Sequence, residues 1–415
     1  MFAKRSRHRS LFSLPRDFAH RRRFRRKLIN FIGIPLLSLF VAYVLTRPTG
    51  GAGVALPRKL EAEGRIAAKG PASAKDGANL ASGASVANGV STSDGLKAIA
   101  EPPMMNGAYM LDIGPEAVTQ VPDVMLHDAR RNTDVHVKIF YPEEQGVYPV
   151  IVISPGGSSS ETCCDTLTRH WASYGYITLQ ASSDESAAEN GEAQPANPRA
   201  QKKISTAAQD PSQVLDRAKD ISFVLDSLGL LAKRVPALQG QLDVENMGVG
   251  GVGSGAGAAQ ALAGAFLDLP NKPHASLADP RVRAVLLLSP PGPGEFGFGA
   301  HSWDRVTLPV LSVTGSLDLG AQKQSPDWRE IPYQKSLPGN KFQLFVQGAD
   351  SASLYSGKSP ATGHPGSGAA ILGFTDSASL AFWDAYLKTD PRAKLYLLSD
   401  GLPDFSQGRV QLLRR

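Results

Sequence analysis

Residues 247–264 read Met-Gly-Val-Gly-Gly-Val-Gly-Ser-Gly-Ala-Gly-Ala-Ala-Gln-Ala-Leu-Ala-Gly, and this stretch decides the fold. It begins as a short apolar strand, passes through a cluster of glycines and continues as an alanine-rich segment that favours a helix. Glycine suits a sharp turn because it has no Cβ. We therefore predict a buried strand, a glycine turn and a helix, with Gly253 at the centre of the turn between Gly251 and Gly255.

The alternation of strand and helix continues on both sides of this turn. Residues 148–154 form an apolar run, as expected of a strand that is buried on both faces of a sheet. Further strands are expected at residues 176–180, 247–250, 282–289, 310–314 and 341–346, an antiparallel hairpin at 121–127 and 135–141, and helices at 167–173, after the capping Asp210, at 256–267 and at 376–387. The pattern predicts an α/β fold, a mostly parallel central sheet with helices on both faces.

The charge of the chain is unevenly placed. Residues 1–27 carry eleven Lys and Arg against a single acid, Asp17, which makes this tail +10 within a total of +6. The rest of the chain is therefore mildly acidic, at −4. Nothing in that balance indicates nucleic-acid binding by the globular part.

An apolar, uncharged run extends from Leu28 to Leu45, directly after the basic tail. At about 1.5 Å per helical residue it nearly crosses a hydrocarbon core of roughly 30 Å. We predict a transmembrane signal anchor at residues 28–46, with the basic tail in the cytoplasm and the C-terminal domain outside, periplasmic in a Gram-negative cell. A cleavable signal peptide is the alternative, although its apolar region is normally shorter.

A stretch rich in Gly, Ala, Ser and Lys separates this run from the globular region. Residues 47–103 have few large apolar side chains and no periodicity. Such a composition cannot bury enough surface to offset its conformational entropy, so we predict a disordered linker. The domain is expected to span residues 104–415, with a polar loop or lid at residues 182–203.

Several stretches taken in order resemble the bacterial dienelactone-hydrolase-like and platelet-activating-factor-acetylhydrolase-like branch of the α/β-hydrolase superfamily. The resemblance covers most of residues 120–395. It rests on residues 137–142, 150–157, 170–176, 220–226 and 381–387, and on the glycine turn at 251–255. It implies an α/β-hydrolase fold with a serine nucleophile on the turn, an acid after a later strand and a histidine base after the last strand.

Two of these three positions are not filled by the residues that the family chemistry needs. Gly253 stands at the nucleophile position of Gly-x-Ser-x-Gly, and Ser351 stands at the base position in Gly-Ala-Asp-Ser. Asp318 matches the acid, so it is the retained member. Loss of a serine or a base removes several orders of magnitude in rate. The resemblance therefore implies a degenerate triad and a binding or interaction module without serine-hydrolase activity.

The main-chain donors of an oxyanion site remain in the sequence. By the resemblance, they are the N–H groups of Gly156, Gly157 and Ser254, which indicates a site for a small ester or acyl ligand. The alternative is an active carboxylic-ester hydrolase that uses a displaced nucleophile, for which Ser254 is a weak candidate, with the loop residue His364 as a substitute base. A protein partner is a further possibility.

Two other features of the sequence bear on function, a pair of cysteines and a second glycine pattern. Cys163 and Cys164 are adjacent and are the only cysteines; buried thiols, a vicinal disulfide, pairing with another chain and a thiol nucleophile all stay open. Gly248-x-Gly250-x-x-Gly253 also fits a dinucleotide fingerprint, but the strand at residues 282–289 ends without the acidic residue which that site requires. We therefore expect no cofactor and no metal.

Overall fold

The computed structural model describes residues 104–105, 107–156, 162–183, 210–360 and 367–415. The chain divides into two units, Met1–Asn88 and Gly89–Arg415, and every described residue belongs to the second. The basic tail, the predicted membrane anchor and the whole of the predicted linker lie outside the described residues. Among the helices that are described, none has the length and apolar character of a membrane span.

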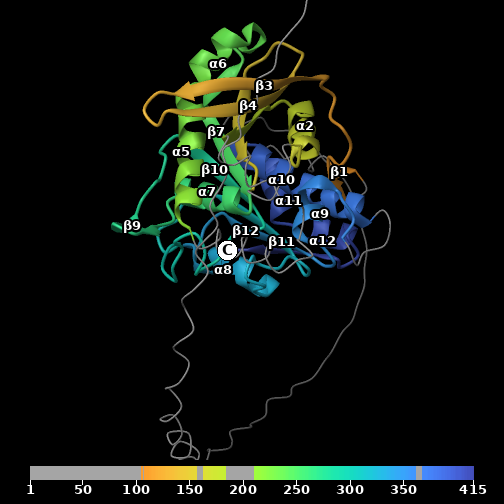
Figure 1. The fold of residues 1–415 in the computed structure, drawn as a ribbon. Coiled ribbons are helices and arrows are strands. Elements are labelled where there is room, and N and C mark those ends of the chain that lie inside the picture. Colours follow the sequence, from red (N-terminus) through yellow and green to blue (C-terminus); the bar gives the residue numbers. More distant parts are fainter. Residues whose placement is uncertain (1–103, 106, 157–161, 184–209, 361–366) are drawn as a thin grey trace, which may run out of the picture. The chain divides into compact units, whose positions relative to one another are not determined.

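A nine-stranded sheet forms the centre of the described region (Figure 1). Its order is β13-β12-β11-β10-β7-β5-β6-β4-β3. The six strands from β12 to β6 run parallel, whereas β4, β3 and β13 pair antiparallel. The strands are β3 (Val118–Asp128), β4 (Thr133–Pro142), β5 (Tyr148–Ser154), β6 (Ile177–Ser183), β7 (Leu242–Val252), β10 (Val282–Leu288), β11 (Val310–Gly315), β12 (Lys341–Val346) and β13 (Val410–Arg414). The predicted α/β class with a mostly parallel sheet is confirmed.

Helices cover both faces of this sheet (Figure 1). On β5, Val150 and Val152 belong to the apolar cluster that contains α5 (Ser212–Asp226) and α7 (Ser254–Leu262). Ile151 and Ile153 belong to the opposite cluster, which contains α2 (Asp165–Ser173) and α10 (Ser367–Leu387). Successive side chains of a strand point to opposite faces, so a continuous apolar run is what a doubly covered strand requires.

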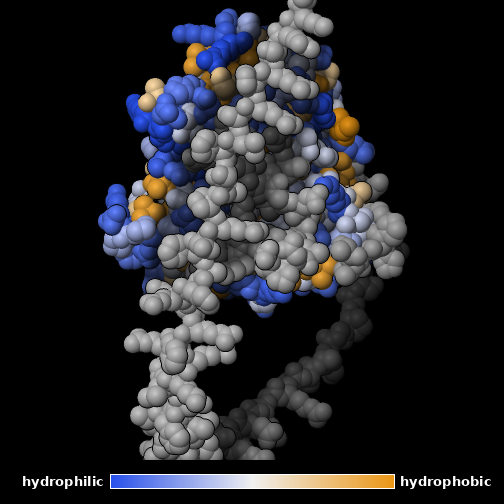
Figure 2. All heavy atoms as spheres, viewed as in Figure 1, coloured by the Kyte–Doolittle hydropathy of each residue, from blue (hydrophilic) through white to orange (hydrophobic). Residues whose placement is uncertain are grey.

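Shorter elements complete the described region. They are β1 (Met104–Met105), β2 (Ala108–Tyr109), α6 (Leu228–Arg234), the 3-10 helix η1 (Pro236–Leu238), β8 (Leu267–Leu269), β9 (Lys272–Ala275), α8 (Pro326–Lys335), α9 (Ser351–Ser356), α11 (Pro391–Leu397) and α12 (Gly401–Phe405). The surface seen in Figure 2 is mainly hydrophilic where it is described, with hydrophobic residues scattered over it. That face therefore shows no broad apolar docking surface among the described residues.

The structure corrects three expectations about element limits. The helix after the glycine turn ends at Leu262, not at residue 267, because Gly264 has a φ of 104° that an α-helix cannot continue, and residues 267–269 form β8. The last long helix begins at Ser367, nine residues before the expected start. The cap of α5 is Pro211, although the carboxylate of Asp210 still accepts the N–H of Ser212 at 2.9 Å.

The chain reverses its direction of winding at β5. From β5 it passes through α2 to β6 on one side, and then through α5 to β7 on the other side of β5. In open α/β sheets, ligands bind outside the carboxyl ends of the strands at such a switch point. The ends of β5 and β7, where Pro155, Gly156 and Gly253 lie, are therefore the place to look for a site.

Candidate functional site

The turn after β7 has an unusual backbone conformation at Gly253. Its φ is 54° and its ψ is −115°, a combination that few residues with a side chain adopt. Its N–H donates to the oxygen of Leu288 at 3.0 Å, and its oxygen accepts the N–H of Gly257 at 3.0 Å. A Cβ added to Gly253 would meet nothing within 4 Å. The turn therefore has room for a side chain at Gly253, the predicted nucleophile position, and the sequence places none there.

The two flanking glycines are needed because other main-chain atoms approach them closely. A Cβ on Gly251 would lie 2.2 Å from the carbonyl carbon of Gly255, inside the turn itself. A Cβ on Gly255 would lie 2.1 Å from the main-chain oxygen of Ser154, at the end of β5. Gly251 thus allows the first turn of α7 to fold back on β7, and Gly255 allows that turn to lie directly against the carboxyl end of β5.

The candidate oxyanion positions are only partly described. Gly156 is buried after β5, and the preceding Pro155 accepts a hydrogen bond at its main-chain oxygen from the Arg217 guanidinium at 3.3 Å. Ser254 is the first residue of α7 and is 7% exposed. Gly157 and the proposed substitute base His364 lie outside the described residues.

Asp318 lies after β11 and its side chain is fully buried. The hydroxyl of Thr314 donates to Oδ2 at 2.9 Å, and Nε of Arg329 lies 2.9 Å from Oδ1. Burial raises the pKa of this carboxyl above its usual value, and the Arg329 guanidinium opposes that rise. The retained acid is therefore held by its own turn and by a buried cation.

Arg329 joins two loops, those after β10 and β11, to α8 at this edge of the sheet. From α8 it donates to the main-chain oxygens of Asp318 at 3.0 Å, Leu319 at 2.6 Å, Ser289 at 2.6 Å and Pro290 at 3.2 Å. The guanidinium is thus satisfied almost wholly by carbonyls and one carboxylate. Sequence reasoning missed this residue, since no spacing or motif distinguishes it from other arginines.

Ser351, at the base position, is the first residue of α9. The preceding Asp350 caps this helix: its carboxylate accepts the N–H of Ser353 at 2.9 Å, and the Ser353 hydroxyl accepts the N–H of Asp350 at 3.0 Å. The negative charge of Asp350 acts to raise the pKa of Asp318, so the two loops lie close together. The N–H of Leu317 also donates to the oxygen of Ala349 at 2.9 Å. The acid and base positions are therefore neighbours, but a serine hydroxyl cannot serve as the base.

A second buried carboxyl group lies near Arg329, and sequence reasoning missed it as well. Glu295 is 3% exposed, and the amide of Gln324 donates to its Oε1 at 2.9 Å. Burial raises the pKa of Glu295, and the positive charge of Arg329 lowers it. One arginine thus balances two buried carboxyl groups, which explains how both are accommodated.

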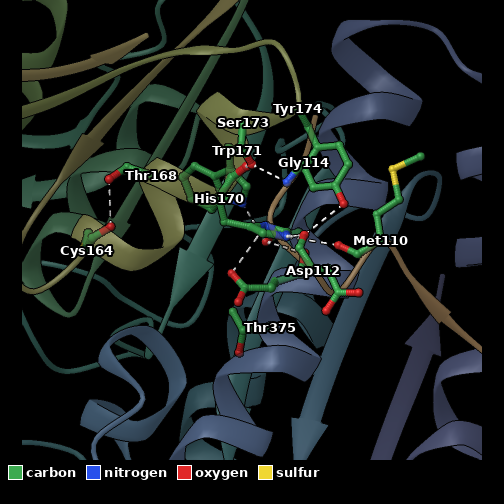
Figure 3. A network of polar contacts seen from close by, with 12 residues as sticks. Met110, Asp112, Gly114, Cys164, Thr168, His170, Trp171, Ser173, Tyr174 and Thr375 are labelled. Atoms are coloured by element: carbon green, nitrogen blue, oxygen red, sulfur yellow. Dashed lines mark hydrogen bonds and ion pairs between the residues drawn. The ribbon is translucent and has the colours of Figure 1, made fainter. Parts of the chain in front are cut away.

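The buried His170 is unsuited to replace the missing base. Its Nε2 lies 3.0 Å from the oxygen of Met110 and 3.2 Å from that of Asp112 (Figure 3). Both oxygens only accept hydrogen bonds, so Nε2 carries a proton and is engaged by the backbone. These contacts give His170 a structural role on α2.

The adjacent cysteines are both free and buried. Their sulfur atoms are 3.1 Å apart, and Cys164 precedes the first residue of α2. Burial and the neighbouring Cys163 raise the pKa of Cys164. A thiol nucleophile needs a lowered pKa, so the structure favours the reading of Cys163 and Cys164 as structural thiols.

Comparison with known proteins adds no relative. No model of a protein family matches the chain, and no curated protein matches it.

Proposed function

We propose that this chain is a membrane-tethered protein of α/β-hydrolase fold that has lost serine-hydrolase chemistry and binds a small ester or acyl ligand without cleaving it. The proposal combines the resemblance read from the sequence with the geometry at the carboxyl edge of the sheet. The candidate positions Gly253, Asp318 and Ser351 follow one another in the order nucleophile, acid, base that α/β-hydrolases use. Each lies just beyond a parallel strand, after β7, β11 and β12 respectively.

One observation carries the proposal. The turn at Gly253 has a strained strand-to-helix conformation with open space on its outer side, which is where a nucleophile would project. The acid position nearby is engaged with Arg329, a cation that cannot act as a base at physiological pH. The turn thus carries no nucleophilic side chain, and the carboxylate of Asp318 is already paired with Arg329.

The same edge keeps groups that attract a carbonyl oxygen. The first turn of α7 begins at Ser254, and the peptide dipoles of a helix are aligned so that their N–H ends point toward its first turn. A partial positive charge at this helix end favours a polarised or anionic oxygen. An ester or acyl carbonyl therefore suits the space in front of Gly253 better than a cation does.

Activity-based labelling separates this proposal from an active esterase. The purified chain is treated with a fluorophosphonate, and we expect no labelling above that of the Ser254→Ala variant. Ser399→Ala serves as the control, because it removes a hydroxyl that lies away from the turn, after α11. Labelling of wild type and Ser399→Ala that disappears in Ser254→Ala would identify Ser254 as a displaced nucleophile and refute the loss of chemistry.

Ligand binding is tested with p-nitrophenyl butyrate as the probe. We expect a concentration-dependent rise in the melting temperature of the chain without release of p-nitrophenol. Gly253→Phe should abolish the rise by filling the space before the turn. Gly240→Phe is the matched control, since Gly240 also has a positive φ and open surroundings but precedes β7, at the opposite end of the strand. Equal melting shifts in the two variants would contradict a ligand site at the turn.

The membrane anchor and the outward orientation are part of the proposal and rest on the sequence alone. Residues 28–46 supply the apolar run, and residues 1–27 supply the flanking positive charge. Protease added to spheroplasts should digest the C-terminal domain and leave the anchor protected. A domain that resists external protease until the membrane is opened would contradict this orientation.

A further inference from the structure

Residues 108–114, here called the strap, form the first part of the described domain after β1 and lie on α2 and α10. At one end, the N–H of Tyr109 donates to Oγ of Ser377 on α10 at 2.8 Å. At the other end, the N–H of Gly114 donates to Oγ of Ser173 on α2 at 2.8 Å (Figure 3). The hydroxyl of Tyr174 also donates to the oxygen of Asp112 at 2.9 Å. The strap is thus held at both ends by side chains of the two helices.

The middle of the strap is held by the imidazole of His170. Its Nε2 lies within hydrogen-bond distance of two strap oxygens, those of Met110 and Asp112 (Figure 3). Because a peptide oxygen has no proton to give, Nε2 must be the donor in both contacts. This fixes one proton of the ring on the side of the strap.

The other ring nitrogen faces a carboxyl group on α10. Nδ1 of His170 lies 3.6 Å from Oδ1 of Asp376, which is longer than a hydrogen bond, and each of these atoms is buried without a hydrogen-bond partner among the described residues. A bare nitrogen lone pair facing a bare carboxylate would be repulsive, and an unpaired buried charge is costly. The contact is favourable when a proton lies between the two atoms, whichever of them carries it.

We propose that His170 and Asp376, through the one proton at their contact, act as a pH-sensitive latch, which holds the strap on the domain and lets its segment from Met110 to Gly114 loosen when that proton is lost at alkaline pH. Without the shared proton, the ring has one N–H for two faces that both need a donor. It must then lose either the strap oxygens of Met110 and Asp112 or the contact with Asp376.

Burial of the pair places the transition above neutral pH. Burial alone raises the pKa of Asp376 to about 8. Burial lowers the pKa of His170, while its two backbone contacts and the negative charge of Asp384 on α10 raise it. Two further groups lie near the pair. The ring of Tyr174, which directly follows α2, has its centroid 5.2 Å from that of the His170 ring, and the carboxylate of Asp112 on the strap is exposed. The proton is therefore retained at neutral pH and lost as the pH rises through about 8.

The Tyr109 end of the strap provides an internal reference. The Tyr109 hydroxyl donates to Oδ2 of Asp384 at 2.9 Å, and Tyr176 donates to Oδ1 at 2.7 Å. Burial and the charge of Asp384 raise the pKa of both tyrosines, so both stay protonated where Asp376 titrates. The Tyr109 end should therefore stay bound to the domain when the segment from Met110 to Gly114 loosens.

Amide hydrogen exchange of the full-length chain tests the latch at pH 6.5 and pH 9.5, after correction for the intrinsic rate at each pH. We expect protection of the Gly114 amide to fall at least tenfold at pH 9.5, while the amides of Tyr109 and Val152 keep theirs. Asp376→Asn should keep Gly114 protected at both pH values, because its amide group donates to Nδ1 without titrating. Asp112→Asn is the control and should behave as wild type, since that carboxylate is exposed.

Two results would overturn the proposal. One is equal corrected protection of Gly114 at the two pH values in wild type. The other is a loss of protection in Asp376→Asn as large as that in wild type. If Asp376→Asn does not fold, His170→Gln replaces it: its amide donates to the strap at any pH, so a remaining pH-dependent loss at Gly114 would equally refute the latch.

Discussion

The glycine turn makes a quantitative prediction that separates three neighbouring positions. We consider Gly251→Ala, Gly253→Ala and Gly255→Ala, which each add the same methyl group. At Gly253 the new Cβ meets nothing within 4 Å, so the cost is confined to the backbone conformation with φ 54° and ψ −115°. Holding a residue with a side chain in such a region costs about 1–3 kcal/mol.

The other two positions add a collision with main-chain atoms. The methyl group would lie 2.2 Å from the carbonyl carbon of Gly255 in one variant and 2.1 Å from the oxygen of Ser154 in the other. Neither neighbour is a side chain that rotates away, so the end of β5 or the start of α7 must shift. Overpacking of this kind typically costs about 1–3 kcal/mol and occasionally more, and we place both variants at or above the upper limit.

Urea denaturation of the wild-type and variant chains measures the difference. We expect the wild type to have the highest unfolding free energy and Gly253→Ala an intermediate one. Gly251→Ala and Gly255→Ala should have the lowest unfolding free energies, at similar values. Gly255→Ala as stable as wild type would show that α7 does not lie against the end of β5. Gly253→Ala as the least stable variant would show that the space in front of the turn is filled. Either result would remove the structural basis for placing the nucleophile position at Gly253.

Three further predictions follow from buried polar groups. Arg329→Met leaves Asp318 buried without its cation and should lower the unfolding free energy at pH 7 by about 3–5 kcal/mol. The loss should be smaller at acidic pH, where the carboxyl group of Asp318 is protonated. A loss of unfolding free energy that does not depend on pH would contradict the ion pair. Burial lowers the pKa of Lys341 to about 8, so the unfolded chain binds more protons than the folded chain between about pH 8 and pH 10.5. Stability measured by urea should therefore gain a rising contribution with pH in that window, which Lys341→Met lacks. Cys163 and Cys164 should react with Ellman's reagent only after denaturation, because both thiols are buried; rapid reaction of the folded chain would reopen a reactive role.

Much of the fold could be predicted because its signals are local. The apolar run of β5 was predicted with the limits that the structure has, Tyr148–Ser154, and the same holds for β12, Lys341–Val346. The strand, glycine turn and helix around Gly253 could be predicted because the tolerance of glycine for sharp turns and the preference of alanine for helices are local properties of the chain. By contrast, β13 was missed, since a short edge strand after several helices has little pattern of its own.

The candidate site was predictable only in part. The sequence predicts roles for Gly253, Asp318 and Ser351, and these stay predictions; it did not reveal the partner of Asp318, which is eleven residues away on another element. It also gave no sign that Asp350 caps α9 beside that carboxyl group. A side chain meets its partners through the packing of elements, and a single sequence does not contain those distances.

The sequence by itself determined the class of the fold and the glycine turn, and its resemblance to α/β-hydrolases predicts that a serine and a histidine are missing from the positions where that chemistry would need them. The tertiary structure alone decided the order of the strands, the conformation of Gly253 and the pairing of Asp318 with Arg329. It also brought the strap, His170 and Asp376 together from three separate parts of the chain. The physical reason is that backbone preference and the pattern of burial depend on neighbouring residues in the sequence. Ion pairs and hydrogen bonds between distant residues depend instead on distances that only the complete fold sets.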